Sequence, residues 1–199
     1  MKIGALVLAA GGSARLGRPK QLLTFQGQSL VRRAAKAALE ADCAPLAIVT
    51  GQWRKEIAAT LRGLSVTIVP NENWQRGIGS SIRAGVEALQ SCAALVILAC
   101  DQPHLNVDLI RALIRKHEET SQSIIASAYS GALGIPALFA HDYFKRILSL
   151  GDEQGAKSII LAQPNDVAHV VFPEGAIDID TLDDLETWQT TVQNGCTKG

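Results

Sequence analysis

The chain has 199 residues, 47% of them hydrophobic and 19% charged, which is enough for one domain with a sizeable core and argues against disorder. Nineteen basic residues balance nineteen acidic ones, so the chain lacks the strong positive field that draws nucleic acid or an anionic membrane surface to a protein. We therefore expect no nucleic-acid partner and only local binding of phosphate. We also expect a single domain over residues 1–193 and a frayed tail over residues 194–199.

The apolar run at residues 3–10 is too short to cross a bilayer and has the wrong flanks for a signal peptide. We therefore expect a cytoplasmic protein that binds no membrane. The four cysteines fit neither a C-x-x-C pair nor a zinc site, and we expect reduced, mostly buried thiols. They are Cys43, Cys92, Cys100 and Cys196.

The hydrophobic pattern predicts strands and helices in regular alternation. Short apolar runs predict strands at residues 3–10, 46–50, 66–69, 94–100, 124–128, 137–139, 167–172 and 176–179. Helical spacing of apolar residues predicts helices at 29–41, 55–61, 80–90, 107–119, 142–150, 156–161 and 182–191. This order predicts an α/β fold, a Rossmann-like, doubly wound and mostly parallel sheet with helices on both faces.

The most informative segment is residues 8–20, which leaves the first strand through a glycine pair and carries the cations Arg15 and Lys20. Glycines let backbone N–H groups approach an anion closely, and cations complete its neutralisation, so the segment predicts a phosphate site rather than a tight turn with solvated cations. Gly17 is followed by Arg-Pro instead of the Lys-Ser/Thr of a P-loop, which disfavours an ATPase or GTPase. The absence of G-x-G-x-x-G disfavours a nicotinamide or flavin enzyme.

The pattern L-A-A-G-x-S-x-R-x-G-x-x-K-x-L-L over residues 8–23 resembles the signature of the molybdenum cofactor cytidylyltransferases. These belong to the wider family of nucleotidyltransferases that resemble the molybdopterin-guanine dinucleotide enzymes. Further blocks follow in the family's order, at residues 77–85, 101–103, 134–139, 151–157 and 178–181. The resemblance implies an NTP-transferase domain of the nucleotide-diphospho-sugar transferase type. Guanine-using members typically carry Gly at the position of Ala10, so this residue favours CTP.

The resemblance assigns roles to particular residues. Nucleotide binding is expected from Leu8, Ala9, Ala10, Gly11, Gly12, Ser13, Arg15, Lys20, Gly79, Ser80 and Ser81. Catalytic roles are expected for Arg15, Lys20 and Asp101. Mg²⁺ is the expected cofactor, held by Asp101 and Asp180, because a hard cation shared with phosphates needs only one or two protein carboxylates. An isolated aspartate at either place would by default be a turn or capping residue.

The later blocks are expected to serve the phosphate acceptor. The acceptor contacts implied by the resemblance are Gly134, Pro136, Gly151, Asp152 and Lys157. A lysine such as Lys157 more often faces solvent than binds a ligand. We expect the three tryptophans to be packing or rim residues, because nothing in the sequence places them beside the predicted phosphate-binding segment at residues 8–20. They are Trp53, Trp74 and Trp188.

The resemblance implies a reaction in which the phosphate of molybdopterin receives the cytidylyl group of CTP, releasing pyrophosphate and forming molybdopterin cytosine dinucleotide. It also implies a molybdoenzyme or its chaperone as a further partner. Three alternatives stay open at this stage. They are a nucleotidyltransferase with GTP or with a sugar or alcohol phosphate, an oxidoreductase recruited from the same scaffold, and a non-catalytic carrier of the cofactor.

Overall fold

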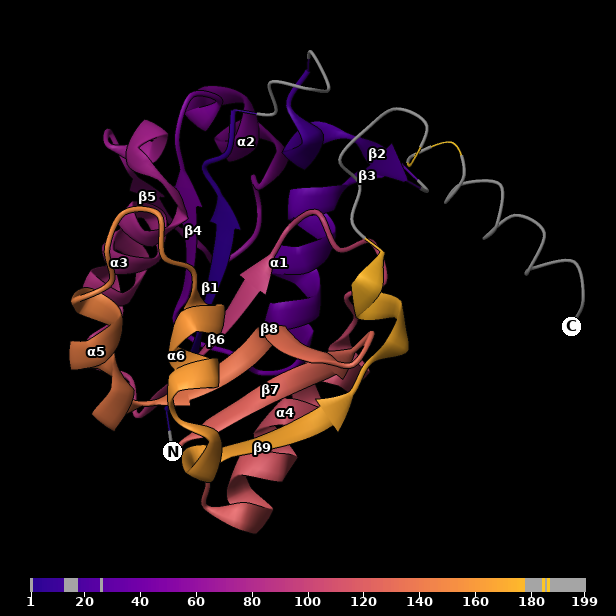
Figure 1. The fold of residues 1–199 in the computed structure, drawn as a ribbon. Helices are drawn as coiled ribbons and strands as arrows, with labels where there is room; N and C mark the ends of the chain where they lie inside the picture. Colours follow the sequence, from indigo (N-terminus) through magenta and orange to yellow (C-terminus); the bar gives the residue numbers. More distant parts are fainter. Residues whose placement is uncertain (1, 13–17, 26, 178–183, 185, 187–199) are drawn as a thin grey trace, which may run out of the picture.

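The computed structural model describes residues 2–12, 18–25, 27–177, 184 and 186 of the chain. Its main sheet has seven strands in the order β5-β4-β1-β6-β8-β7-β9 (Figure 1). The strands are β1 (Ile3–Ala9), β4 (Leu46–Thr50), β5 (Thr67–Pro70), β6 (Ala94–Ala99), β7 (Ile124–Tyr129), β8 (Ala132–Ala140) and β9 (Val167–Val171). Within these residues β8 alone runs antiparallel to its neighbours, so the sheet is mostly parallel, as predicted.

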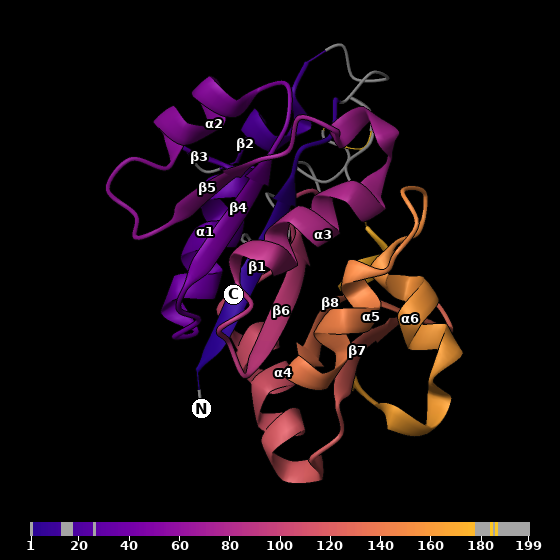
Figure 2. The same cartoon turned by 90° about the vertical axis from the view of Figure 1, so that its left-hand side faces the viewer.

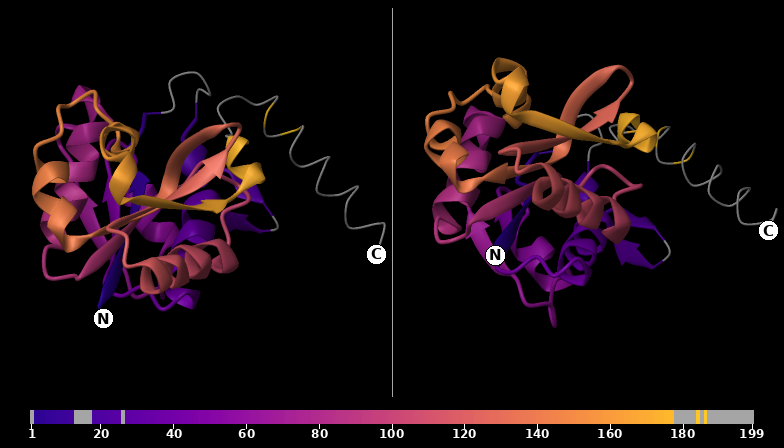
Figure 3. Two further views of the ribbon diagram at one scale, coloured as in Figure 1. Left: turned by 60° about the horizontal axis from the view of Figure 1, so that its bottom comes forward. Right: turned by 90° about the horizontal axis from the view of Figure 1, so that it is seen from below.

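Helices cover both faces of this sheet. They are α1 (Leu30–Glu40), α2 (Arg54–Thr60), α3 (Ile78–Ala88), α4 (Val107–Thr120), α5 (Phe144–Leu148) and α6 (Ala156–Ala162). In Figure 1, α6 lies in front of the sheet and α1 behind it, and Figure 3 shows α4 and α6 on opposite sides of β7 and β9. Figure 2 shows α3 and α5 next to each other on one face. The doubly wound arrangement is therefore confirmed.

Short turns and a hairpin complete the fold. Single turns of 3₁₀ helix are η1 (Lys20–Leu22), η2 (Trp74–Arg76), η3 (His141–Tyr143), η4 (Pro164–Asp166) and η5 (Pro173–Ala176). The strands β2 (Thr24–Phe25) and β3 (Gln28–Ser29) pair with each other in a small separate sheet. No helix among the described residues is both long enough and apolar enough to span a bilayer.

β1 occupies the middle of the sheet because both of its faces are apolar. Its side chains alternate between two cores, as the two-residue period of a strand requires. Ala5 and Val7 belong to the core beneath α1 and α4, whereas Leu6 belongs to the core beneath α3 and α5. All three are fully buried, as expected for a parallel strand covered by helices on both sides.

Most of the predicted elements that the structure describes are present, with differences at some of their ends. β8 is longer than the predicted strand at residues 137–139, and the predicted helix at 142–150 is divided into η3 and α5. α3 begins at Ile78 rather than at Ser80, because Gly77 caps it with a φ of 135° and the Ser80 hydroxyl donates to the Gly77 carbonyl at 2.8 Å. The predicted helix at 182–191 lies outside the continuously described residues.

The strand predicted at residues 176–179 is wrong for its first two residues. Ala176 ends the 3₁₀ turn η5, which begins at Pro173, and Ile177 follows it in an irregular conformation. Proline has no N–H to donate to a strand ladder and sets the φ of a helical turn, so the local chain favours a turn here. Residues 178 and 179 lie outside the described part of the chain.

The cysteines behave as predicted wherever the structure describes them. Cys43, Cys92 and Cys100 are free and buried, and Cys196 lies outside the described residues. Burial, with a smaller contribution from Asp42, raises the pKa of the Cys43 thiol to about 12. Burial likewise raises the pKa of the Cys100 thiol, with Asp101 adding to the effect. Neither sulfur is therefore a thiolate at neutral pH.

Candidate nucleotide site

One pocket of about 330 Å³ lies at the carboxyl ends of β1 and β6. Ligands of open α/β sheets commonly bind at this edge. The lining residues are Leu8, Ala10, Gly11, Gly12, Lys20, Gln21, Trp74, Gln75, Gly77, Ile78, Ser81, Ala99, Cys100 and Asp101. The pocket therefore unites three segments that are distant in the sequence. They are the glycine loop, which holds Gly11 and Gly12, together with η1; the start of α3; and the end of β6. We call it the nucleotide pocket.

The glycine loop enters the nucleotide pocket through Gly11 and Gly12, directly after β1. Gln21, which is 1% exposed, donates its side-chain N–H groups to the carbonyl of Ala9 at 3.2 Å and to that of Gly11 at 2.6 Å. In a trans peptide the carbonyl and the next N–H point in opposite directions, so these bonds fix the orientation of the loop amides. Sequence reasoning missed Gln21, because a glutamine beside a lysine looks like any surface residue.

The predicted catalytic residues Lys20 and Asp101 meet in this pocket. The Lys20 ammonium lies 2.5 Å from a carboxylate oxygen of Asp101, and the two side chains are 20% and 21% exposed. Lys20 is placed by η1 and Asp101 by the end of β6, so 81 residues of chain separate the partners. The pair satisfies two charges in a partly buried place, where either charge alone would carry a desolvation cost.

The predicted sites of Ser13, Arg15 and Asp180 lie outside the described residues. Among the described residues, no group of three or more His, Cys, Asp or Glu side chains is suited to hold a metal ion. The Asp101 carboxylate nevertheless fits magnesium, which binds one or two protein carboxylates and takes its other ligands from phosphate oxygens and water. The donor set of the pocket thus suits a cation that arrives with a nucleotide.

Trp74 packs against the core, as predicted, but it also lies beside the glycine loop, which the sequence did not indicate. A methyl group added at Gly12 would lie 2.8 Å from a ring carbon of Trp74, and one added at Gly51 would lie 2.7 Å from another. The indole is therefore in close contact with the glycine loop and lines the nucleotide pocket. The sequence held no signal for this contact, because the sheet brings η2 beside β1 across about sixty residues of intervening chain.

The start of α3 forms another wall of the pocket, with Ser81 lining it. Asn71 is 7% exposed and donates to the hydroxyls of Ser80 at 2.9 Å and Ser81 at 3.0 Å. The predicted nucleotide residue Gly79 is buried, and its N–H donates to the Asp152 carbonyl at 2.8 Å. The N–H of Gly79 and the hydroxyl of Ser80 are thus engaged within the protein.

The predicted acceptor residues lie in β8, in α6 and in the loop between α5 and α6. Gly134 and Pro136 lie within β8, where a Cβ added at Gly134 would lie 2.3 Å from the Tyr129 hydroxyl. The Pro136 carbonyl accepts a hydrogen bond from Ser127. Lys157 is exposed on α6.

The other two predicted acceptor residues, Gly151 and Asp152, lie in the loop between α5 and α6. The Asp152 carboxylate is bound by Arg76 and Arg83. Contact between these five residues and an acceptor stays a prediction.

The comparison with known families agrees with this geometry. A model of the MobA-like NTP transferase domain matches residues 5–167, which include most of β1, Lys20, Asp101 and the first turn of α3. The chain belongs to the MobA-like NTP transferase family. It is thus a nucleotidyltransferase-family chain with the fold of the nucleotide-diphospho-sugar transferases.

Three relatives illustrate the range of the family. The chain is 35% identical to the nicotine blue oxidoreductase of Paenarthrobacter nicotinovorans over 64% of its own length, a match that covers 62% of that relative. It is 25% identical to the molybdenum cofactor cytidylyltransferase of Escherichia coli, covering 93% of this chain and 94% of the relative.

The third relative is known from solved structures. The structure of Rv0371c from Mycobacterium tuberculosis superposes with a TM-score of 0.81 at 25% identity, covering 96% of this chain and 98% of that one. A complex of Rv0371c with manganese superposes with a TM-score of 0.76 at 22% identity, covering 96% of this chain and 99% of that one.

Proposed function

We propose that the protein transfers the cytidylyl group of CTP to the phosphate of molybdopterin, in a Mg²⁺-dependent reaction that releases pyrophosphate. The observation that carries this proposal is the meeting of Gly11, Gly12, Lys20 and Asp101 in one pocket at the carboxyl edge of the sheet. Backbone amides and a cation suit a triphosphate, and the carboxylate suits the cation that accompanies it. The relation to the Escherichia coli cytidylyltransferase supports the choice of nucleotide and acceptor.

In the proposed reaction, an oxygen of the acceptor phosphate attacks the α-phosphorus of CTP while the bond from that phosphorus to the leaving pyrophosphate oxygen breaks. The acceptor is already ionised, so the reaction needs no strong general base. Catalysis then comes from positioning and charge neutralisation. Lys20 and the amides of the glycine loop stabilise the negative charge that builds up on pyrophosphate. Asp101 and Asp180 would hold Mg²⁺, which when bound would further neutralise the phosphate oxygens.

The proposed base preference rests on Ala10. This residue is 5% exposed and lines the pocket beside Gly11. In the family that this chain resembles, guanine-using members typically carry glycine at this position, and on that ground we propose cytosine as the base. GTP is the competing nucleotide that the experiment must exclude.

The decisive experiment is calorimetric titration of the purified protein with CTP and with GTP, each with and without Mg²⁺. We expect Mg²⁺-dependent binding of CTP that is at least tenfold tighter than binding of GTP, a difference of about 1.4 kcal/mol. Asp101→Asn should abolish the Mg²⁺ dependence because an amide is a poor ligand for a hard cation. Incubation with molybdopterin and CTP should then yield the cytosine dinucleotide and pyrophosphate.

Asp42→Asn is the matched control for Asp101→Asn. Asp42 is exposed between α1 and β4, away from the nucleotide pocket, and its positive φ of 61° is one that asparagine also adopts readily. This control should bind CTP as the wild type does. Absence of binding of either nucleotide by the wild type would overturn the proposal, and equal binding of both would overturn the CTP preference.

A second candidate function is an oxidoreductase activity, which the 35% identity to the nicotine blue oxidoreductase favours. The lack of a G-x-G-x-x-G loop after β1 argues against it. Oxidation of a reduced nicotinamide in the presence of a dye acceptor, or flavin absorbance in the purified protein, would support this candidate. Neither signal is expected if the protein is a cytidylyltransferase.

A further inference from the structure

The loop between α5 and α6, residues 149–155, packs against the first turn of α3. The N–H of Gly79 donates to the Asp152 carbonyl at 2.8 Å. A Cβ added at Gly77 would lie 2.2 Å from the Asp152 carbonyl oxygen, and one added at Gly79 would lie 2.1 Å from that of Gly151. Backbone atoms cannot move aside as a side-chain end can. These two glycines are therefore required by the loop, whatever ligand lies nearby.

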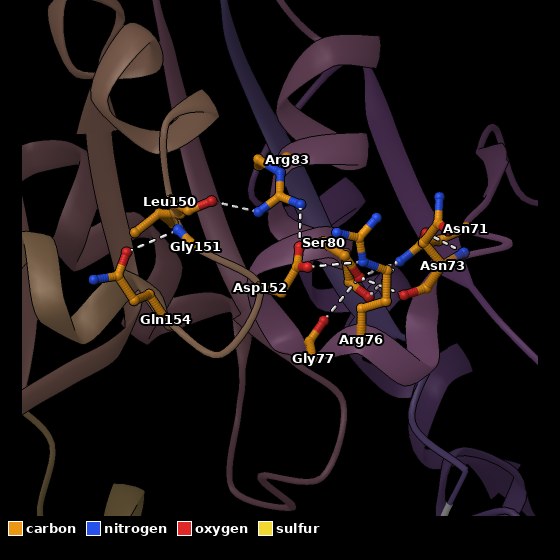
Figure 4. A network of polar contacts seen from close by, with 11 residues as sticks. Asn71, Asn73, Arg76, Gly77, Ser80, Arg83, Leu150, Gly151, Asp152 and Gln154 are labelled. Atoms are coloured by element: carbon orange, nitrogen blue, oxygen red, sulfur yellow. Dashed lines mark hydrogen bonds and ion pairs between the residues drawn. The ribbon is translucent and has the colours of Figure 1, made fainter.

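Two ion pairs also join this loop to η2 and α3 (Figure 4). One Asp152 carboxylate oxygen lies 2.5 Å from the guanidinium of Arg83, and the other lies 2.8 Å from that of Arg76. Arg83 also donates to the Leu150 carbonyl, so its two arms bind the loop at two points. Arg76 comes from η2 and Arg83 from α3, so the single carboxylate of Asp152 joins three elements.

The first turn of α3, against which the 149–155 loop packs, is also a wall of the nucleotide pocket. Gly77, Ile78 and Ser81 line that pocket on one side of the turn, while the loop covers the other side. A shift of the loop would therefore move three lining residues at once. Asn71 also binds the two serines of this turn by hydrogen bonds.

We propose that Asp152 is a positioning residue for the nucleotide: by binding Arg76 and Arg83 it fixes the start of α3, and with it the wall of the pocket that faces the nucleoside. This inference rests on the proposed function. It gives the 149–155 loop a role in nucleotide affinity, whereas the resemblance implies a contact of Gly151 and Asp152 with the acceptor. The Asp152 side chain acts through α3, because both of its oxygens are engaged by arginines.

The test is binding of CTP with Mg²⁺ in the absence of acceptor, measured by calorimetry for the wild type and for Asp152→Asn. We expect the variant to bind CTP about tenfold more weakly. Its turnover at saturating CTP should stay within about twofold of the wild type, because lost ground-state positioning raises KM without lowering kcat. A purely structural residue would instead lower the melting temperature and the active fraction and leave KM unchanged.

Arg83→Met removes the other side of the ion pair and should weaken CTP binding to a similar extent. The double variant that combines Asp152→Asn with Arg83→Met should bind CTP about as tightly as whichever single variant binds it more weakly. Both substitutions break the same interaction, so their effects should not add. Arg76→Gln removes only the more exposed arm, whose side chain is 63% exposed, and should have a smaller effect of about threefold. That milder variant keeps the inference testable if Asp152→Asn does not fold.

Asp166→Asn is the matched control. Asp166 lies on η4, is not among the residues that line the nucleotide pocket, and accepts a hydrogen bond from Tyr143. It should leave CTP affinity unchanged even where it lowers stability. Wild-type affinity in Asp152→Asn would overturn the inference while leaving the proposed function intact. An increase in the acceptor KM alone would assign Asp152 to the acceptor. Absence of nucleotide binding by the wild type would overturn the proposed function itself.

Discussion

Lys20 and Asp101 illustrate at the level of single residues how the pocket can be stable without a ligand and still accept one. Each side chain is about one-fifth exposed, and each neutralises the other across 2.5 Å. A triphosphate with its cation offers both residues a better partner, because Lys20 gains phosphate oxygens and Asp101 gains a divalent ion. We infer that nucleotide binding exchanges the internal ion pair for two ligand contacts.

Replacing Lys20 by alanine should reveal the catalytic part of this exchange. We expect turnover to fall by on the order of a hundredfold, or about 2.7 kcal/mol, because one preorganised charge on the leaving group is lost. Pyrophosphate release with CTP and molybdopterin is the measurement. Lys145→Ala on α5, where the side chain is exposed, should release pyrophosphate at the wild-type rate. Near-normal release by Lys20→Ala would contradict the assignment.

At the level of elements, α3 packs unusually closely on both of its sides. Its start is pressed against the 149–155 loop, and its middle is pressed against β1. A Cβ added at Gly85 would lie 2.2 Å from a methyl carbon of Leu6, which is fully buried and has no free space to move into. The small residues of α3 thus set how near the helix lies to the strand that carries the glycine loop.

Gly85→Ala tests this packing. Alanine gains about 1 kcal/mol over glycine in a helix, whereas overpacking a core costs about 1 to 3 kcal/mol. We therefore expect a net loss of up to about 2 kcal/mol in the free energy of unfolding, measured by urea denaturation. Glu87→Ala changes an exposed residue of the same helix and should stay within about 0.5 kcal/mol. An increase in stability for Gly85→Ala would show that α3 can move away from β1.

At the level of the whole molecule, Asp152 joins the half that carries β1 and β4 to the half that carries β7, β8 and β9. The hydrogen bond from Arg83, helped by the charges of both arginines, holds the pKa of the Asp152 carboxyl below its ordinary value of 3.8. A carboxyl whose pKa is lower in the folded state adds stability above its unfolded pKa. That stability is lost as the pH falls through the folded pKa.

The pH dependence of this ion pair gives a prediction for the whole fold. Wild-type protein should be more stable than Asp152→Asn at pH 6, and the difference should shrink as the pH falls below about 4. Urea denaturation of both proteins at several pH values is the measurement. A difference that stays constant down to the acid limit would show that the charge of Asp152 does not stabilise the fold.

Much of this protein could be read from its sequence, because the deciding signals are local. The apolar run of β1, the helical spacing in α1 and the Asn106 cap of α4 each act within a few residues, and all three elements form where predicted. The doubly wound sheet follows from the order of such elements. The glycine loop, Lys20 and Asp101 were predicted to belong to one site, and they line one pocket; phosphate binding there stays a prediction.

The tertiary structure decided what depends on contacts between distant segments. Trp74 lies against Gly12, Gln21 orients the loop carbonyls, and Asp152 binds Arg76 and Arg83, yet none of these contacts leaves a local pattern. Gly79, for which the resemblance implied nucleotide binding, is required by a loop some seventy residues away. The sequence by itself determined which elements form and what chemistry the pocket can hold. Only the packing of those elements decided which side chains shape the pocket, because close packing is a property of surfaces brought together by the fold.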